Sequence, residues 1–201
     1  MSTEASFADL LAPHGDGDAL RRLTRYAELL DRWSERHNLV SFTGREELVN
    51  RHIVDSLAAA PFLAEQGRLL DVGSGAGLPG VPLLAVRPQW DGVLLEPRQK
   101  RWAFLRTVIR ELDLVAKVDR SRYQDLGECA PFDVITVRAV GGYEDLLEWT
   151  RARLAPSGEV LLWTTDDGVT AMKAVVGWRV LSSRLSGLDC GRLARLQPCF
   201  T

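Results

Sequence analysis

The chain has 201 residues, of which 46% are hydrophobic and 26% charged, and its formal net charge at pH 7 is −2. This length and balance are typical of one globular domain with a complete core, and they exclude a disordered or fibrous chain. No apolar run approaches the roughly 20 residues that a membrane-spanning helix needs, so a soluble protein is expected.

Targeting and redox features point the same way. The opening MSTEASFADL lacks the basic and apolar regions of an export signal. Cys129, Cys190 and Cys199 form no CxxC pair, and the three histidines are scattered along the chain. We expect a cytoplasmic protein with no disulfide framework, no metal site and no membrane partner.

Helical patterns dominate the first part of the chain. Residues 1–17 end in the breaker sequence PHGDGD and predict a short helix followed by a turn. Apolar residues recur at helical spacing over 19–37 and predict an amphipathic helix. A further helix is expected over 45–60, with Thr43 as its N-cap and Glu46 completing a capping box.

Short strands that alternate with helices begin after this region. Strands are predicted at 69–72, 93–96, 116–119 and 132–138, then after the turn PSGE, and finally as an antiparallel pair at 179–185 and 193–197. This alternation predicts a doubly wound α/β fold, in which helices cover both faces of a mostly parallel seven-stranded sheet. We therefore predict an N-terminal helical extension over residues 1–62 and a Rossmann-like domain over residues 63–201.

A glycine-rich loop follows the first predicted strand, in the sequence RLLDVGSGAGLPGVPLL (68–84). Asp71 precedes Gly73 by two positions, where it would be a poor neighbour for the pyrophosphate of a dinucleotide. S-adenosylmethionine has no phosphate, and its ammonium and sulfonium groups are cationic, so a nearby carboxylate is favourable. The loop, with Ser74 and Gly75, therefore favours a methyl donor over a nicotinamide cofactor.

Two further segments fit a nucleoside. Glu96 ends the second predicted strand, where its carboxylate can accept hydrogen bonds from both ribose hydroxyls. This geometry also occurs in NAD enzymes, so Glu96 does not distinguish the two cofactors. Tyr123 and Gln124 follow the third predicted strand, where class I methyltransferases hold the adenine. An ordinary turn is the alternative explanation of that pair.

Other classes of methyltransferase fit less well. Amino-directed enzymes carry an N/D-P-P-Y/F motif after the fourth strand, where this chain reads VRAVGGYEDL. Cytosine C5 enzymes need a nucleophilic cysteine at that place, and the chain has none there. No cluster of metal-binding carboxylates of the catechol-directed kind is present in the sequence.

Four segments carry a family resemblance that runs in order over about residues 20–162. They read HNLVSFTGREELVNRHIVDSLAAAPFL, LLDVGSGAGLPGVPLLAVRP, LLEPRQKRWAFLR and FDVITVRAV. The chain thereby resembles the bacterial small-subunit (16S) ribosomal RNA guanine-N7 methyltransferases, known as RsmG or glucose-inhibited division protein B. The resemblance implies a Rossmann-like class I methyltransferase fold with an N-terminal helical extension. It also implies S-adenosylmethionine as cofactor and ribosomal RNA or the small ribosomal subunit as partner.

The same resemblance implies roles for individual residues. Donor contacts of the family correspond to Gly73, Leu78, Arg138 and the pair Tyr123–Gln124. Basic residues near the acceptor correspond to His52, Arg122 and Arg138. The full set expected to contact the donor is Asp71, Gly73, Ser74, Gly75, Leu78, Glu96, Tyr123, Gln124 and Arg138.

Basic residues also cluster outside these motifs. The chain has 22 Arg and 3 Lys. One predicted helix and the strand ends after it carry Arg98, Lys100, Arg101, Arg106, Arg110, Arg120 and Arg122. The cluster fits a polyanion such as RNA, and a solvated helix face explains its first part equally well.

The chain departs from the family pattern at its acceptor side. The fifth strand of the family commonly ends in Leu-Lys-Gly, but here Leu162-Trp163-Thr164 is followed by a threonine and two aspartates. Arg192 and Arg195 are possible sources of the missing positive charge. Two alternatives therefore stay open: a small-molecule methyltransferase, and a non-catalytic RNA-binding module. The first would use an aromatic pocket built from Trp33, Phe42, Tyr143 or Trp163.

Overall fold

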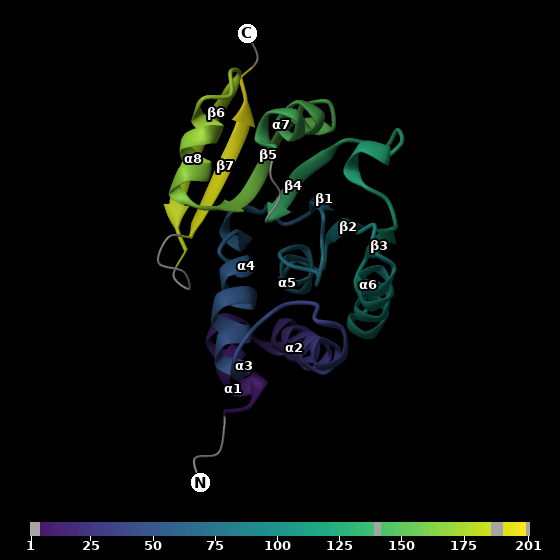
Figure 1. Cartoon of the computed structure of the whole chain (residues 1–201). Coiled ribbons are helices and arrows are strands. Elements are labelled where there is room, and N and C mark those ends of the chain that lie inside the picture. Colours follow the sequence, from purple (N-terminus) through teal and green to yellow (C-terminus); the bar gives the residue numbers. More distant parts are fainter. Residues whose placement is uncertain (1–4, 139–141, 186–190, 200–201) are drawn as a thin grey trace.

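The computed structural model describes residues 5–138, 142–185 and 191–199. Seven strands form one sheet in the order β3-β2-β1-β4-β5-β7-β6 (Figure 1). They are β1 (Gly67–Val72), β2 (Trp90–Leu95), β3 (Ala116–Asp119), β4 (Phe132–Arg138), β5 (Leu154–Thr164), β6 (Trp178–Arg184) and β7 (Arg192–Pro198). The first five are parallel, and β7 is antiparallel to both of its neighbours. The predicted α/β fold with its closing antiparallel pair is confirmed.

The helices lie on both faces of the sheet. They are α1 (Phe7–Leu11), α2 (Gly17–His37), α3 (Gly44–Glu47), α4 (Asp55–Leu57), α5 (Gly80–Val86), α6 (Gln99–Leu112), α7 (Tyr143–Arg151) and α8 (Asp166–Lys173). In Figure 1, α2, α5 and α6 lie on one face, and α7 and α8 on the other. Each face has its own core, because successive side chains of a strand point to opposite faces.

The N-terminal helices share the first of these cores. Leu23, Tyr26 and Leu30 of α2 are buried in the same cluster as Leu69 of β1 and Phe104 of α6. Burial of such side chains stabilises a fold by roughly 1.5–3 kcal/mol each, so this contact couples the helices strongly to the sheet. A division of the chain at residue 62 stays a prediction.

The segment predicted as one helix over 45–60 is a composite. α3 continues into a π-helical turn over Leu48–Val54, and α4 follows it directly. Thr43 is the N-cap of α3, as predicted, but the predicted capping box is wrong in its partner, because the backbone N–H of Thr43 donates to the side chain of Glu47, not Glu46, at 2.6 Å. The Thr43 side chain makes no capping hydrogen bond.

Trp163 belongs to the core and not to an open aromatic pocket. Its side chain is buried on β5, and its indole Nε1 donates to the carbonyl oxygen of Asp55 at 2.8 Å. This bond connects β5 to the first residue of α4. The turn that carries His52 leads directly into that helix. The aromatic wall that the small-molecule alternative would draw from Trp163 is therefore absent.

We predict that Trp163→Phe lowers the free energy of unfolding by about 1–3 kcal/mol, because it leaves the buried Asp55 carbonyl without this donor. Trp149→Phe is the matched control, since the buried Nε1 of Trp149 has no partner in the described part of the chain. Denaturant unfolding of both variants measures the difference. Equal losses would show that the Trp163 hydrogen bond contributes nothing specific.

Candidate functional site

The glycine loop between β1 and α5 has a shape that excludes side chains. Gly73, Gly75 and Gly77 have φ angles of +71°, +57° and +92°, in the left-handed region that favours glycine. A Cβ atom at Gly77 would lie 2.7 Å from Cγ2 of Val81. Gly73 is exposed at the carboxyl end of β1, so a ligand can approach its backbone closely.

Glu96 lies against this loop, and its contact with the ribose of a donor stays a prediction. Its side chain is 3% exposed and follows the last residue of β2. Oε2 accepts a hydrogen bond from the backbone N–H of Gly75 at 3.0 Å, and Oε1 accepts one from that of Arg98 at 2.7 Å. The carboxylate is thereby held in place at the carboxyl edge of the sheet, and each oxygen keeps further acceptor capacity.

Asp71 lies beneath the loop. Its carboxylate is 1% exposed, accepts a hydrogen bond from the Thr136 hydroxyl at 2.8 Å and another from the backbone N–H of Gly80 at 3.3 Å. Burial raises the pKa of Asp71 to about 6, and the hydrogen bond from Thr136 opposes that rise. Asp71 therefore joins β1, β4 and α5. Its direct contact with a donor stays a prediction.

The neighbouring loop residues turn inward. The Ser74 hydroxyl is buried and donates to the backbone carbonyl of Asp71 at 3.0 Å. Leu78 is buried in the first core. The side chains at these two positions shape the loop, and a contact of either residue with the donor stays a prediction.

Tyr26 of α2 is a loop-positioning residue that the sequence pattern did not reveal. Its side chain is fully buried, and its hydroxyl donates to the carbonyl of Ala76 at 2.7 Å. Burial raises the pKa of this phenol, which keeps the hydroxyl protonated and able to donate. Helical spacing identified Tyr26 only as a core position. The sequence offered one indication of this role, namely a tyrosine hydroxyl on a helix face otherwise formed by leucines, where it needs a buried hydrogen-bond partner.

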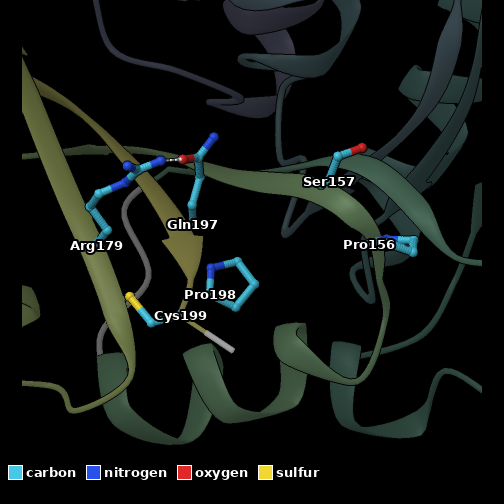
Figure 2. A pocket seen from close by; sticks show the side chains of 7 residues that line it. Pro156, Ser157, Arg179, Gln197, Pro198 and Cys199 are labelled. Carbon is cyan, nitrogen blue, oxygen red and sulfur yellow. Dashed lines mark hydrogen bonds between the residues drawn. The ribbon is translucent and has the colours of Figure 1, made fainter. Parts of the chain in front are cut away.

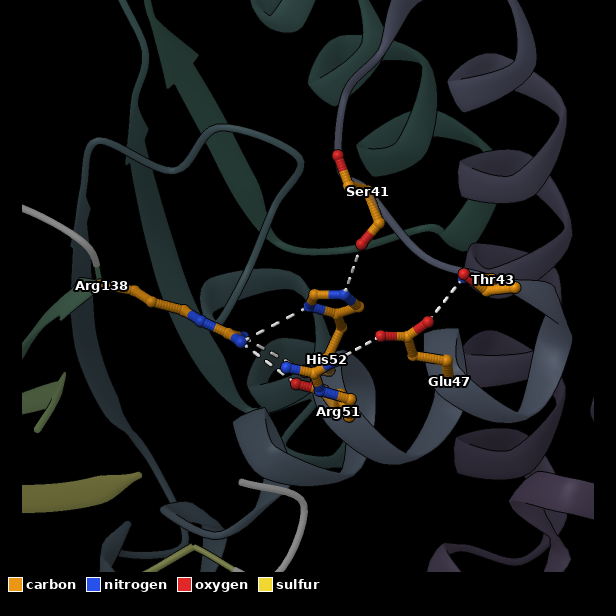
Figure 3. Close-up of polar contacts among 6 residues, drawn as sticks. All are labelled: Ser41, Thr43, Glu47, Arg51, His52 and Arg138. Atoms are coloured by element: carbon orange, nitrogen blue, oxygen red, sulfur yellow. Dashed lines mark hydrogen bonds and ion pairs between the residues drawn. The ribbon is translucent and has the colours of Figure 1, made fainter. Parts of the chain in front are cut away.

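Arg138 and His52 form a polar cluster at the end of β4 (Figure 3). The Arg138 guanidinium donates to the carbonyls of Arg51 at 3.1 Å and of His52 at 3.4 Å, and to the Ser56 hydroxyl at 3.4 Å. The π-helical turn carries both carbonyls, and such wide turns often occur at functional sites. The structure thus joins two residues predicted to lie near the acceptor.

Both ring nitrogens of His52 have partners. Nε2 lies 3.1 Å from the carbonyl of Ser41, which can only accept, and Nδ1 lies 3.5 Å from Nη2 of Arg138, which can only donate. This arrangement requires a neutral ring with its hydrogen on Nε2. Burial lowers the pKa of His52, and the charge of Arg138 lowers it further. The geometry suits His52 to positioning Arg138 better than to proton transfer.

The remaining predicted residues lie beyond β3. Arg122 and Gln124 are exposed, and Tyr123 is partly buried with its ring edge-on to Trp149, at a centroid distance of 5.0 Å. No hydrogen bond or ion pair joins Arg122 to the Arg138 cluster in the described residues. The donor and acceptor roles of these three residues stay predictions.

The predicted basic helix is α6. Arg98, Lys100, Arg106 and Arg110 are exposed, and Arg110 pairs with Glu111 at 3.6 Å. Arg101 is partly buried, and its Nη2 donates to the carbonyl of Leu39 at 3.4 Å. Arg101 therefore braces the segment after α2, whereas the exposed cations keep both interpretations of the cluster open.

A cavity of about 400 Å³ lies near the amino-terminal end of β5, at the end of the sheet away from the glycine loop (Figure 2). It is lined by Ser157 near the start of β5 and by Arg179 and Gln197, which hydrogen-bond to each other. The glycine loop follows the carboxyl end of β1, and β5 runs parallel through β4 to that strand. This cavity is therefore remote from the loop and does not belong to the candidate site.

Metal and membrane features can be tested on the described part of the chain. There, no group of three or more His, Cys, Asp or Glu side chains is arranged to hold a metal ion. No helix in that part combines the length and the apolar character needed to span a bilayer. Cys129 and Cys199 are free and exposed, and Cys190 lies outside the described residues.

Comparisons with known proteins identify the family of the chain. The GidB family model, described as rRNA small subunit methyltransferase G, matches residues 19–172. The chain is 36% identical to ribosomal RNA small subunit methyltransferase G of Xanthomonas axonopodis pv. citri, over 87% of this chain and 78% of that protein. It is 38% identical to the protein of the same name from Laribacter hongkongensis, over 85% and 84% respectively.

Solved structures share the fold at low sequence identity. The glycopeptide N-methyltransferase MtfA, in complex with sinefungin, has a TM-score of 0.63 and 12% identity, over 74% of this chain and 87% of that chain. A putative O-methyltransferase from Klebsiella pneumoniae has a TM-score of 0.61 and 14% identity, over 98% and 97%. The predicted class I methyltransferase fold is confirmed.

We predict that Tyr26→Phe weakens S-adenosylmethionine binding about fivefold, because the Ala76 carbonyl loses its donor and the loop is held less firmly. Isothermal titration calorimetry measures the affinity. Tyr143→Phe is the control, since the Tyr143 hydroxyl bonds to Thr164 at 2.9 Å and not to the loop. Equal affinities for the wild type and the Tyr26 variant would exclude this role.

We predict that the free energy of unfolding depends on pH through the carboxyl group of Asp71. Its folded pKa of about 6 lies above the ordinary value of 3.8, so the folded state binds more protons between these values. The stability that protonated Asp71 contributes is complete below pH 3.8 and is lost as the pH rises through 6. Relative to Asp71→Asn, the wild-type free energy of unfolding should fall by about 2 kcal/mol between pH 4 and pH 7.

The amide of this variant can use the same neighbours, because the Thr136 hydroxyl also lies 3.3 Å from the Leu70 carbonyl and can turn to donate there. Urea unfolding at several pH values gives both curves. A stability difference that does not change with pH would contradict the raised pKa.

Proposed function

The chain belongs to the GidB family, rRNA small subunit methyltransferase G, and we propose that it methylates guanine N7 in small-subunit ribosomal RNA with S-adenosylmethionine as donor. The observation that carries the proposal is the extent of the family match. It covers the glycine loop, Glu96, and the cluster of His52 and Arg138 in one span, residues 19–172. A cytoplasmic location, with the small ribosomal subunit as partner, is part of this proposal.

The donor fits the residues present. The loop offers a backbone free of side chains at Gly73 and Gly75, and Glu96 offers a fixed carboxylate for the two ribose hydroxyls. Arg101 is a cation near the loop, with its Nη1 3.5 Å from the point that a Cβ of Gly75 would occupy. When bound, S-adenosylmethionine supplies an electrophilic methyl group on a positively charged sulfur.

The acceptor side agrees with a base that needs no deprotonation. Guanine N7 has an in-plane lone pair and carries no proton, so the protein requires no general base. A neutral His52 with both nitrogens occupied is compatible with that chemistry. Arg138 is the residue we assign to orienting the guanine, since arginine can donate to O6 while the lone pair of N7 stays free to attack the methyl carbon. Exclusion of water and alignment then supply the rate enhancement.

The end of β5 lacks the lysine that the family commonly has there, and a neighbouring strand carries an arginine close to that position. Thr164 of β5 pairs in register with Arg192 of β7, so Arg192 lies at the same edge of the sheet as the absent lysine. Arg192 forms an ion pair with Asp166 at 2.8 Å, whereas Arg195 lies three residues farther along β7 and pairs with Glu159. Arg192 is therefore the better candidate for the acceptor-side cation, and an RNA phosphate could compete with Asp166 for it.

The small-molecule alternative has less support. Trp163 is buried and hydrogen-bonded, and Trp33 packs against Phe104 at a centroid distance of 5.4 Å. The Tyr143 hydroxyl is bonded to Thr164. These aromatic residues of the suggested pocket are thus engaged in packing, and no observation favours a particular metabolite.

We expect the protein to transfer a tritiated methyl group from S-adenosylmethionine to small ribosomal subunits from a strain that lacks its gene. The assay offers intact subunits, naked ribosomal RNA and a metabolite extract side by side, and digestion of the labelled RNA identifies N7-methylguanosine. Label in the metabolite fraction alone would overturn the RNA acceptor. No label, with RNA binding that falls steeply with salt, would instead indicate the non-catalytic RNA-binding module.

Two variants divide this activity into its parts. Arg138→Gln should keep donor affinity within about threefold and lose methyl transfer by about 100-fold, because it removes an orienting group near the acceptor. Glu96→Gln should lose donor affinity itself. Methyl transfer that survives in the Arg138 variant would show that the acceptor does not bind at the end of β4.

A further inference from the structure

A groove of about 640 Å³ lies between α7 and the segment that comprises the end of α8 and the turn before β6. We call it the α7–α8 groove. Both helices lie on the same face of the sheet in Figure 1, opposite α2, α5 and α6. None of the residues to which we assign donor or acceptor contacts lines the groove. It is therefore separate from the glycine loop and from Arg138.

The floor of the α7–α8 groove is continuous with the second core. Tyr143 and Val175 are partly buried and pack against that core, and Trp178 belongs to it. Ala171 and Ala174 are exposed and add small apolar side chains on the α8 side. A second segment laid into the groove would bury this apolar surface, which is the main favourable contribution to protein association.

Val176 extends the apolar surface at the edge of the groove, where it is 91% exposed. The turn that presents it is held from α7, because Nη2 of Arg151 donates to the carbonyl of Gly177 at 3.0 Å. The Arg151 guanidinium also lies 5.0 Å from the centroid of the Trp178 ring. Val176 therefore stands at a fixed place beside an apolar floor, and a continuous apolar patch with a polar rim is typical of an interaction surface.

The rim on the α7 side is acidic. Glu144, Asp145 and Glu148 are exposed and line the groove, and the two glutamates are one helical turn apart on the same face. Glu148 lies 3.8 Å from Arg151 with its side chain 80% exposed, and no ion pair joins the other two acids to a cation in the described residues. The helix dipole alone favours acids in a first turn, so the indication of a ligand is their position along an apolar groove.

These features distinguish between possible occupants. The acidic rim repels an RNA phosphate, which would also gain nothing from the apolar floor. In a second copy of this chain, α6 offers exposed cations, but its apolar residues Phe104, Leu105 and Val108 are buried in its own core. The complementary occupant carries both positive charge and exposed apolar side chains.

We propose that the α7–α8 groove binds a basic amphipathic segment of a partner protein. Its apolar side chains lie on Val175, Val176 and Trp178, and its Lys or Arg side chains pair with the carboxylates of α7. This interaction surface is additional to the proposed methyl transfer and does not depend on it.

The probe for the test is a fluorescein-labelled helical peptide with leucine along one face and lysine along the other. Fluorescence anisotropy with the full chain should show saturable binding. Two-dimensional NMR of the ¹⁵N-labelled chain should place the peptide-induced shifts at residues 143–148 and 171–178. A peptide with glutamate in place of lysine, and one with serine in place of leucine, should each bind about tenfold more weakly.

Two surface variants test the two parts of the groove. Val176→Ser should weaken binding of the leucine–lysine peptide about fivefold, because it removes an apolar contact. Glu144→Gln should weaken it about threefold, which corresponds to one exposed charge pair. Val115→Ser and Glu46→Gln are the matched controls, since Val115 is 61% exposed, Glu46 is exposed on α3, and both lie outside the groove. Both controls should bind the peptide as the wild type does.

Several outcomes would overturn the proposal. Equal losses in the groove variants and their controls would indicate general attraction to an acidic protein, and equal binding of the serine peptide would exclude the apolar floor. Sedimentation velocity that shows a dimer, dissociated by Val176→Ser, would place a second copy in the groove. NMR shifts at residues 143–148 and 171–178 on addition of ribosomal RNA would place RNA there. Methyl transfer is not part of this readout, so its outcome is independent of the proposed function.

Discussion

The shape of one loop governs the candidate site, and hydrogen bonds from three directions hold it. Asp71 bonds from beneath to the start of α5, Glu96 accepts the N–H of Gly75 from the side, and Tyr26 donates to the Ala76 carbonyl from α2. Left-handed backbone at three glycines makes this shape costly for any other residue. Its partners come from separate parts of the chain, so the shape of the loop depends on the packing of α2 against the sheet.

A second constraint is the partly buried positive charge of Arg138 at the end of β4. Burial lowers the pKa of Arg138, and the negative charge of Asp55 opposes this effect. The guanidinium is satisfied by two helix carbonyls, a hydroxyl and a histidine nitrogen, all within or just after one π-helical turn. This network holds the guanidinium in place at the end of β4.

Some sequence predictions failed where a partner far along the chain took over. The pairing of Thr43 failed locally instead, because Glu47 and not Glu46 accepts its backbone N–H. Trp163 was grouped with an open pocket, yet the Asp55 carbonyl, 108 residues earlier, accepts its indole hydrogen. Tyr26 was recognised only as a core residue, since its partner Ala76 lies 50 residues away. Spacing rules describe neighbours on one element and contain no information about such contacts.

The sequence by itself determined the order of strands and helices, the glycine loop, the acid after β2 and the family to which the chain belongs. The elements and the loop follow from local periodicity and short motifs, and the family follows from the resemblance of four segments to its known members. Only the tertiary structure decided that Asp71 is buried under the loop, that His52 is neutral and braces Arg138, and that Arg192 lies beside Thr164. Burial, tautomer and register depend on which distant segments meet, and that is fixed when the sheet and its helices pack together.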